Sequence, residues 1–270
     1  MKKILWLGVF LGGFFLILWI QDRFFRPEPP PPRQESQLTI IEGWTVNDEI
    51  KYLLQEKQVT STVSAASVGR SINAQAFDDR WRTEFSFLKS LPAGRSLEGY
   101  LFPDTYRVWD DQLPEGLVRK QLREFQDRFG GATIGSSSAP LKTLDEVVTL
   151  ASIVEGEVRK PEDRKLVAGI FLKRLKVGMA LQTDATLSYF LGSNRARATA
   201  ADLAVDSPYN SYKYPGLPPS PIGQPGDASM RAVLEPTKSS YWFFLTDRQG
   251  KVFYAKTFEE HLRNKRKAGY

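Results

Sequence analysis

The amino-acid sequence predicts the α+β fold class. Apolar residues recur at helical spacing in three stretches, residues 113–129, 144–159 and 161–178, and this period is typical of helices that bury one face. Short runs rich in β-branched and aromatic residues lie at 38–41 and on either side of the turn at 247–250, where they favour strands. We therefore expect a mixed α+β architecture.

The composition fits a globular protein. The chain has 270 residues, of which 41% are apolar and 25% charged, and its net charge is +6, so one or two domains are expected. The mild basic excess indicates a solvated surface or, as the alternative, attraction to anionic lipid or an anionic polymer. No helix-turn-helix, zinc-finger or RRM pattern indicates nucleic acid. The absence of cysteine excludes disulfides and thiolate chemistry, and a lone histidine, His261, excludes a His-rich metal site. We expect no metal, no cofactor and no nucleic-acid partner.

The N-terminus predicts a membrane anchor. An unbroken apolar run, glycines included, covers residues 4–20 and follows Lys2 and Lys3, which places it at the short end of transmembrane helices. Trp6 and Trp19 lie near its two ends, where interfacial aromatic residues are common. A cleavable signal peptide is the alternative, but the residues after the run offer no small-x-small cleavage site. The two lysines predict a cytoplasmic N-terminus and an extracytoplasmic bulk.

A proline-dense segment follows at residues 26–33. Proline at this density favours extended polyproline II and does not build a packed core. The segment is interpreted as a stiff stalk that holds the rest of the chain away from the membrane.

The remaining elements follow from caps and periodicity. Thr45 and Asp48 form a near capping box at the start of a helix, a weaker helical pattern covers 71–84, and a Gly/Ser loop follows the helix at 113–129. Thr143 and Glu146 form a full capping box for the helix that runs to about residue 159.

Proline and glycine mark the later boundaries. Pro161 starts the next helix and Gly178 ends it. The region after Leu191 is rich in Pro, Gly, Asn and Tyr, which indicates a long loop, with a further helix expected around residues 228–233. Two strands, at 241–245 and 251–254, should form a hairpin.

One carboxyl group is a candidate general acid. Glu155 continues the line of Leu144, Val148 and Ala151, at helical steps of four, three and four, along the apolar face. Burial there would favour the protonated form, which a general acid needs. Glu157 should lie nearer the solvated edge of the helix. From periodicity alone, the better explanation of Glu155 is an ordinary helix-surface glutamate or one engaged in a salt bridge.

Two later segments are rich in groups that suit sugars. Residues 181–186 place polar side chains between apolar ones, and tyrosines and amides follow at 209–214. Aromatic faces stack on pyranose rings and amides bond hydroxyls, but Asn, Pro and Gly are also default turn formers.

Together and in order, these segments resemble the MltG (YceG-like) family of endolytic peptidoglycan transglycosylases. Five motifs support the resemblance, which covers about residues 38–265 together with the family's N-terminal anchor: 97–106, 150–157, 179–184, 207–212 and 216–222. Several motifs in order are far more specific than one short match.

The resemblance implies an activity and a set of site residues. The family's catalytic glutamate falls at Glu155. Family members cut the β-1,4 bond between N-acetylmuramic acid and N-acetylglucosamine in nascent strands and leave 1,6-anhydromuramic ends. The implied partners are glycan strands, the inner membrane and peptidoglycan synthases. The candidate substrate-binding residues, all within these motifs, are Glu98, Tyr100, Glu157, Gln182, Thr183, Asp184, Asn210 and Tyr212.

The expected organisation combines these observations. It has a cytoplasmic tail (1–3), an inner-membrane single-pass anchor (4–21), a stalk (22–37), a LysM-like subdomain (38–92) and an extracytoplasmic catalytic domain (93–270). The LysM-like part is shorter than is usual in the family. Glu235 and the Lys251-Val252-Phe253 segment also depart from the family's pattern.

Two other functions compete with this one. A hydrolytic muramidase would use Asp184 or Glu157 as a second carboxylate, because hydrolysis of a glycosidic bond usually needs two. A non-catalytic, membrane-tethered glycan-binding scaffold would leave Glu155 dispensable.

Overall fold

The computed structural model describes residues 32–56, 79–91, 95–135, 139–192 and 198–269. The chain divides into two units, 1–34 and 35–270, and every element below belongs to the second. The expected anchor and the first part of the stalk lie outside the described residues. Within the part of the chain that is described, no helix is long and apolar enough to cross a membrane.

The first sheet has two antiparallel strands, β1 (Glu35–Thr39) and β2 (Thr105–Trp109), with Leu38 opposite Tyr106. Alternate residues of each strand are buried, as expected for a sheet with one covered face. Strand β1 begins inside the segment assigned to the stalk. Strand β2 was not predicted, although Thr105 to Trp109 alternate polar and apolar residues.

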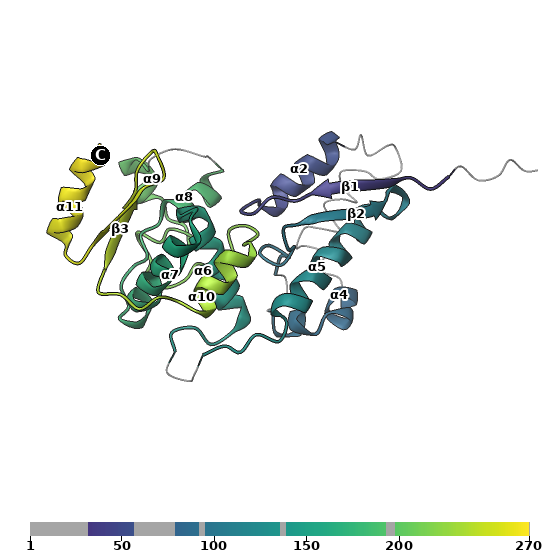
Figure 1. The fold of residues 1–270 in the computed structure, drawn as a ribbon, viewed down its shortest axis with the longest axis horizontal. Helices are drawn as coiled ribbons and strands as arrows, with labels where there is room; N and C mark the ends of the chain where they lie inside the picture. Colours follow the sequence, from purple (N-terminus) through teal and green to yellow (C-terminus); the bar gives the residue numbers. More distant parts are fainter. Residues whose placement is uncertain (1–31, 57–78, 92–94, 136–138, 193–197, 270) are drawn as a thin grey trace, which may run out of the picture. The chain divides into compact units, whose positions relative to one another are not determined.

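In the chain, helices follow each strand of this sheet. The predicted near capping box is confirmed, because Asp48 accepts hydrogen bonds from the N–H and hydroxyl of Thr45 and donates its own N–H back to that hydroxyl. Helix α5 packs on β2 (Figure 1) and buries the predicted apolar face. The helices and helical turns of this part are α2 (Val46–Glu56), α4 (Asp79–Glu84), η2 (Ser86–Ser90), η3 (Asp110–Gln112) and α5 (Glu115–Phe129). Of the helix expected over 71–84, residues 71–78 lie outside the described part.

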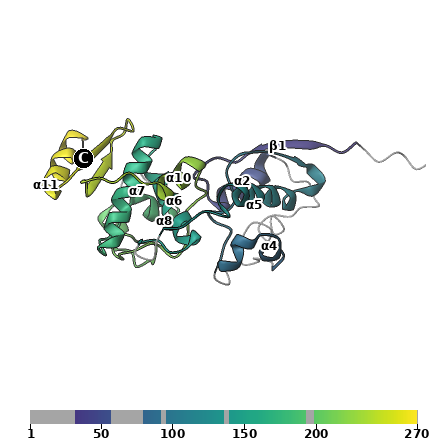
Figure 2. The same cartoon turned by 60° about the horizontal axis from the view of Figure 1, so that its bottom comes forward.

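Three helices contact one another pairwise: α6 (Leu144–Glu157), α7 (Pro161–Lys176) and α10 (Asp227–Leu234) (Figure 2). The capping box at Thr143 and Glu146 is confirmed, and residues 147–154 of α6 are all buried. Because α6 is covered on every side along this stretch, a polar side chain within it lies in a low-dielectric environment.

The last elements are a helix before the predicted loop region, a short helix within it, a hairpin and a terminal helix. Helices α8 (Asp184–Leu191) and α9 (Ala200–Ala204) were not predicted. The predicted hairpin is confirmed by β3 (Phe243–Thr246) and β4 (Val252–Ala255), which pair antiparallel. Helix α11 (Phe258–Lys267) packs on the hairpin and was not predicted.

A buried amide holds three segments of the chain together. The Gln224 side chain accepts a hydrogen bond from the Leu101 N–H and donates one to Glu98, both at 3.0 Å. Its backbone N–H donates to the Trp44 carbonyl at 2.7 Å, and its carbonyl accepts from the Gly43 N–H at 2.8 Å. Gln224 is fully buried, so breaking any one of these bonds would leave a costly unsatisfied group.

Candidate active site

Glu155 lies in the last turn of α6, and its side chain is only 6% exposed. Val148 and Ala151, which precede it on the same line of the helix, are fully buried, so its predicted place on the apolar face is confirmed. Its Oε1 accepts a hydrogen bond from Arg164 Nη2 at 2.5 Å, and its Oε2 accepts one from the Gly226 N–H at 3.0 Å. The carboxyl is therefore held at both oxygens by groups from two other helices.

Arg164 is the cation of this site. It lies in the first turn of α7, is 7% exposed, and donates from Nε to the Val158 carbonyl at 3.1 Å. Its Nη1 lies 3.6 Å from Oε2 of Glu42, a carboxylate from the segment before α2. One buried guanidinium thus faces two carboxyl groups.

The electrostatics of Glu155 set two opposing effects against each other. Desolvation by burial raises the pKa of its carboxyl above the ordinary value, and this effect is the largest. The Arg164 charge and the Gly226 N–H lower the pKa, while the negative charge of Glu42 raises it. The buried Ser229 hydroxyl also faces the carboxyl, but it makes no well-formed hydrogen bond. The net direction is upward, toward the protonated form that can donate a proton.

Arg164, Glu42 and Gly226 were not predicted as site residues. Arg164 carried a usable signal, since it shares a helix face with the buried Val167, Ala168 and Phe171, and an arginine on such a face needs a buried partner. Glu42 and Gly226 are joined to Glu155 only by long-range contacts, for which a single sequence gives no signal.

The expectation that Glu157 is the more solvated glutamate is wrong. Its carboxyl accepts a hydrogen bond from the Ala185 N–H at 3.3 Å, at the N-terminus of α8. Burial raises the pKa of Glu157 to about 7. Glu157 is desolvated because α8, a helix that the sequence did not predict, packs against that side of α6.

Glu98 and Tyr100 are buried, at 4% and 1% exposure. Glu98 accepts from the Val46 N–H and from Gln224, and burial raises its pKa to about 8. The Tyr100 hydroxyl donates to Asp145 at 2.8 Å. Both side chains are engaged inside the protein, so their predicted role in binding substrate directly is not supported by the geometry.

The structure brings together the segments around 182 and 211, as a shared site would require. Gln182 donates its N–H to the Ser211 carbonyl, and Thr183 donates its N–H to the Ser211 hydroxyl, each at 3.0 Å. Thr183 is buried, whereas Gln182 and Asp184 are exposed. The Tyr212 hydroxyl donates to Asp184 at 2.7 Å. Gln182, Asp184 and Tyr212 therefore remain candidate substrate contacts.

Asn210 does not fit its predicted role. It is fully buried, and its Nδ2 donates to the carbonyls of Leu203 and Val205 at 3.0 and 2.9 Å. Its Oδ1 accepts from the Tyr212 N–H at 3.1 Å. Both ends of the amide are used, so Asn210 shapes the loop and does not face a ligand.

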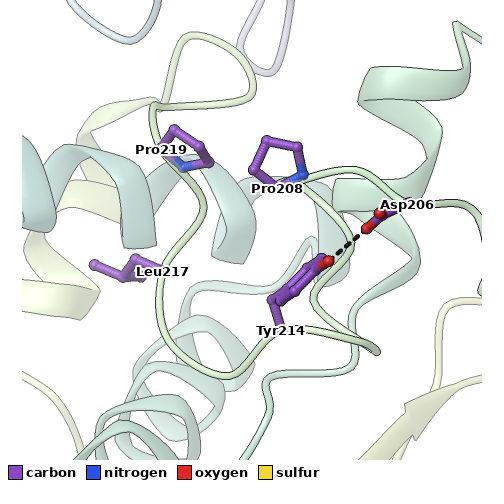
Figure 3. Close-up of a pocket in the computed structure, with 5 residues that line it drawn as sticks. All are labelled: Asp206, Pro208, Tyr214, Leu217 and Pro219. Atoms are coloured by element: carbon purple, nitrogen blue, oxygen red, sulfur yellow. Dashed lines mark hydrogen bonds between the residues drawn. The ribbon is translucent and has the colours of Figure 1, made fainter.

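A separate cavity of about 430 Å³ opens on the loop that follows α9 (Figure 3). Three apolar residues and a hydrogen-bonded Tyr214–Asp206 pair form its walls. Glu155 is not among the lining residues, which are Asp206, Pro208, Tyr214, Leu217 and Pro219. Among the described residues there is no cluster of three or more His, Cys, Asp or Glu side chains able to hold a metal ion.

In this α+β chain, a core helix ends in a desolvated glutamate that is hydrogen-bonded at both carboxyl oxygens. This arrangement is that of a candidate acid–base enzyme. The chain belongs to the YceG-like family, whose model matches residues 23–267, so the family predicted from the motifs is confirmed. A crystal structure of a YceG-like protein from Listeria monocytogenes is similar, with a TM-score of 0.67 and 32% identity over 92% of this chain and 80% of that one.

Two curated relatives are named endolytic murein transglycosylase. The Bacillus subtilis protein is 35% identical over 234 residues, which cover 86% of this chain and 62% of that protein. The Streptococcus pneumoniae protein is 35% identical over 253 residues, which cover 88% of this chain and 45% of that protein. The chain thus spans less than two thirds of the length of these relatives.

Proposed function

We propose that this protein is an endolytic murein transglycosylase with Glu155 as its acid and base. It would cleave the β-1,4 bond between N-acetylmuramic acid and N-acetylglucosamine within nascent strands, leave 1,6-anhydromuramic ends and so limit strand length. The main support is the Glu155 carboxyl, which is buried, has a raised pKa and is held at both oxygens. The names of the two relatives support the substrate class.

The reaction needs one carboxyl group. Protonated Glu155 gives its proton to the glycosidic oxygen as the bond to the muramic acid C1 breaks. The resulting carboxylate then takes the proton of the C6 hydroxyl, whose oxygen bonds to C1. No water is consumed, and the internal nucleophile acts at high effective concentration. Arg164 and the Gly226 N–H would orient the carboxyl and stabilise its charged form between the two proton transfers.

The test is Glu155→Gln in the full-length chain. Glutamine keeps the size of the side chain but does not exchange the proton, so formation of anhydromuramic ends should fall at least about 10²-fold. The control is Glu162→Gln, an exposed glutamate on the neighbouring helix, which should keep normal turnover. Mass spectrometry of digested glycan strands measures the products.

Other product patterns would identify the competing functions. Reducing ends in place of anhydro ends would show a hydrolytic muramidase. Strand binding without cleavage by the unmodified protein would show a scaffold. Normal turnover by Glu155→Gln would show that Glu155 is not the acid.

We also propose the predicted organisation along the chain: an anchor over 4–21, a stalk over 22–37 whose last three residues already belong to β1, a LysM-like subdomain over 38–92 and a catalytic domain over 93–270. The apolar run and the two preceding lysines support a cytoplasmic N-terminus and an extracytoplasmic catalytic domain at the inner membrane. A reporter that works only outside the cytoplasm, fused after Arg33, should be active. Activity of only a cytoplasmic reporter at that position would refute this topology.

A further inference from the structure

The segment that contains Glu42 is held tightly against the loop that leads into α10. Gly43 and Trp44 exchange backbone hydrogen bonds with Gln224, at 2.8 and 2.7 Å. A Cβ atom on Gly223 would lie 2.8 Å from the Gly43 carbonyl oxygen, closer than side chains approach backbone atoms. The two backbones can come this close because residue 223 is glycine.

The Glu42 carboxyl rests directly on Gly226, where an added Cβ would overlap it. Gly226 is also the residue whose N–H donates to Glu155. Glu42 is therefore fixed beside the acid by the same backbone that holds the acid, although it comes from more than a hundred positions earlier in the chain.

The charges alternate in sign through this cluster. Arg164 donates from Nη2 to Glu155 and faces Glu42 with Nη1, at 2.5 and 3.6 Å. The Glu155 side chain is 6% exposed, whereas that of Glu42 is 47% exposed. Glu155 is thus the desolvated end of a carboxyl–guanidinium–carboxyl arrangement, and Glu42 is its solvated end.

We propose that Glu42 is a positioning residue for the reaction: it holds the second edge of the Arg164 guanidinium and divides that cation between two carboxyl groups, so that the ion pair of Arg164 with Glu155 is weakened. The inference rests on the proposed function, in which Glu155 is the acid.

The physical reason is the strength of an undivided ion pair. A guanidinium beside one carboxylate commonly lowers the pKa of that carboxyl by about 1–3 units, which would favour the ionised form of Glu155, the form that does not start the reaction. A second negative charge on the same cation opposes this effect, and Glu42 does raise the pKa of Glu155. The other groups that face Glu155 are the Gly226 N–H and Ser229, both from the start of α10, and Glu42→Gln leaves them in place.

The experiment is the pH–rate profile of Glu42→Gln in the full-length protein, with anhydromuramic ends as the readout. Loss of the negative charge should lower the pKa of Glu155, so the alkaline limb should move to lower pH by about half a unit or more. At a pH above the wild-type limb, the rate should fall about threefold or more, while the rate on the acidic plateau stays near the wild-type value. A merely structural role would lower the rate equally at every pH.

The matched control is Glu235→Gln. Glu235 forms an ion pair of the same 3.6 Å length with Lys165, the next residue along α7, but its side chain is 72% exposed. This variant should keep the wild-type profile. Glu42→Asp retains the charge on a shorter side chain, so its alkaline limb should fall between those of the wild type and Glu42→Gln, and it serves as the test if Glu42→Gln folds poorly.

Two results would overturn the inference. An unchanged alkaline limb in both Glu42 variants would mean that Glu42 does not act on Glu155. Loss of rate at every pH by a folded Glu42→Gln, together with reducing ends from the wild type, would instead make Glu42 the second carboxylate of a hydrolase. Failure of the proposed function is distinguished separately, by normal turnover in Glu155→Gln.

Discussion

The side-chain amide of Asn210 makes three hydrogen bonds to the backbone around it, to the carbonyls of Leu203 and Val205 and from the N–H of Tyr212. It is fully buried. A buried polar group that loses its partner costs about 1–3 kcal/mol, so an amide with this many partners is more important for stability than for contact with a ligand.

We therefore expect Asn210→Ala to lower the free energy of unfolding by about 2–4 kcal/mol, because several backbone groups lose their partners at once. Thermal or denaturant unfolding of the purified protein measures the change. The same substitution at the exposed Asn47 on α2 should change stability by less than about 0.5 kcal/mol. A stable Asn210→Ala protein with a much reduced rate would instead restore Asn210 as a substrate contact.

Residues of the site differ in how far a sequence can reveal them. Glu155 and Arg164 each stand on the apolar face of a helix, where an ionisable side chain conflicts with the surrounding pattern. Glu42 stands in a turn before a helix, where a glutamate is unremarkable. Its importance follows from its distance to Arg164, and that distance depends on the packing of segments remote in sequence.

Among the elements, those with strong local signals were predicted. Helix α6 has a capping box and a continuous apolar face, and α7 begins at a proline and ends before Gly178. Helix α5 and the β3–β4 hairpin likewise follow from periodicity and turn residues.

The elements that were missed are short or depend on tertiary contacts. Helix α8 has eight residues, and the N–H of its second residue, Ala185, donates to Glu157 of α6, so a contact between helices stabilises it. Helix α11 buries no residue fully, yet Thr257 caps it by accepting the Glu260 N–H. The Thr-x-x-Glu pattern was present in the sequence and would have predicted α11.

Among the described residues, three glutamates besides Glu155 have pKa values that burial raises. Burial raises the pKa of Glu49 to about 7, that of Glu98 to about 8 and that of Glu157 to about 7. In each case desolvation outweighs the hydrogen bonds that the carboxyl accepts. Each group is thus protonated in the folded protein at a pH where the same group in the unfolded chain is ionised.

The sign of the resulting pH dependence follows from linkage. Between the unfolded value of 4.5 and the folded values, the folded state binds more protons than the unfolded state, so stability falls as pH rises through this range. His261 makes stability rise with pH, because burial lowers its pKa from 6.5. This rise ends once the pH exceeds about 6.5, because the imidazole is then neutral in both the folded and the unfolded chain. The window from about pH 6.5 to 8.5 therefore isolates the carboxyl groups.

In that window we expect the free energy of unfolding to fall by about 2–4 kcal/mol, with a decrease in Tm of several degrees. Glu98→Gln should flatten this dependence most, because Glu98 has the highest pKa of the three and titrates within the window. The exposed Glu162→Gln should leave the dependence unchanged. The measurement is Tm against pH for the wild type and both variants. Stability that stays level or rises between pH 6.5 and 8.5 in the wild type would contradict the prediction, because it would mean that these three carboxyl groups are already ionised in the folded protein at neutral pH.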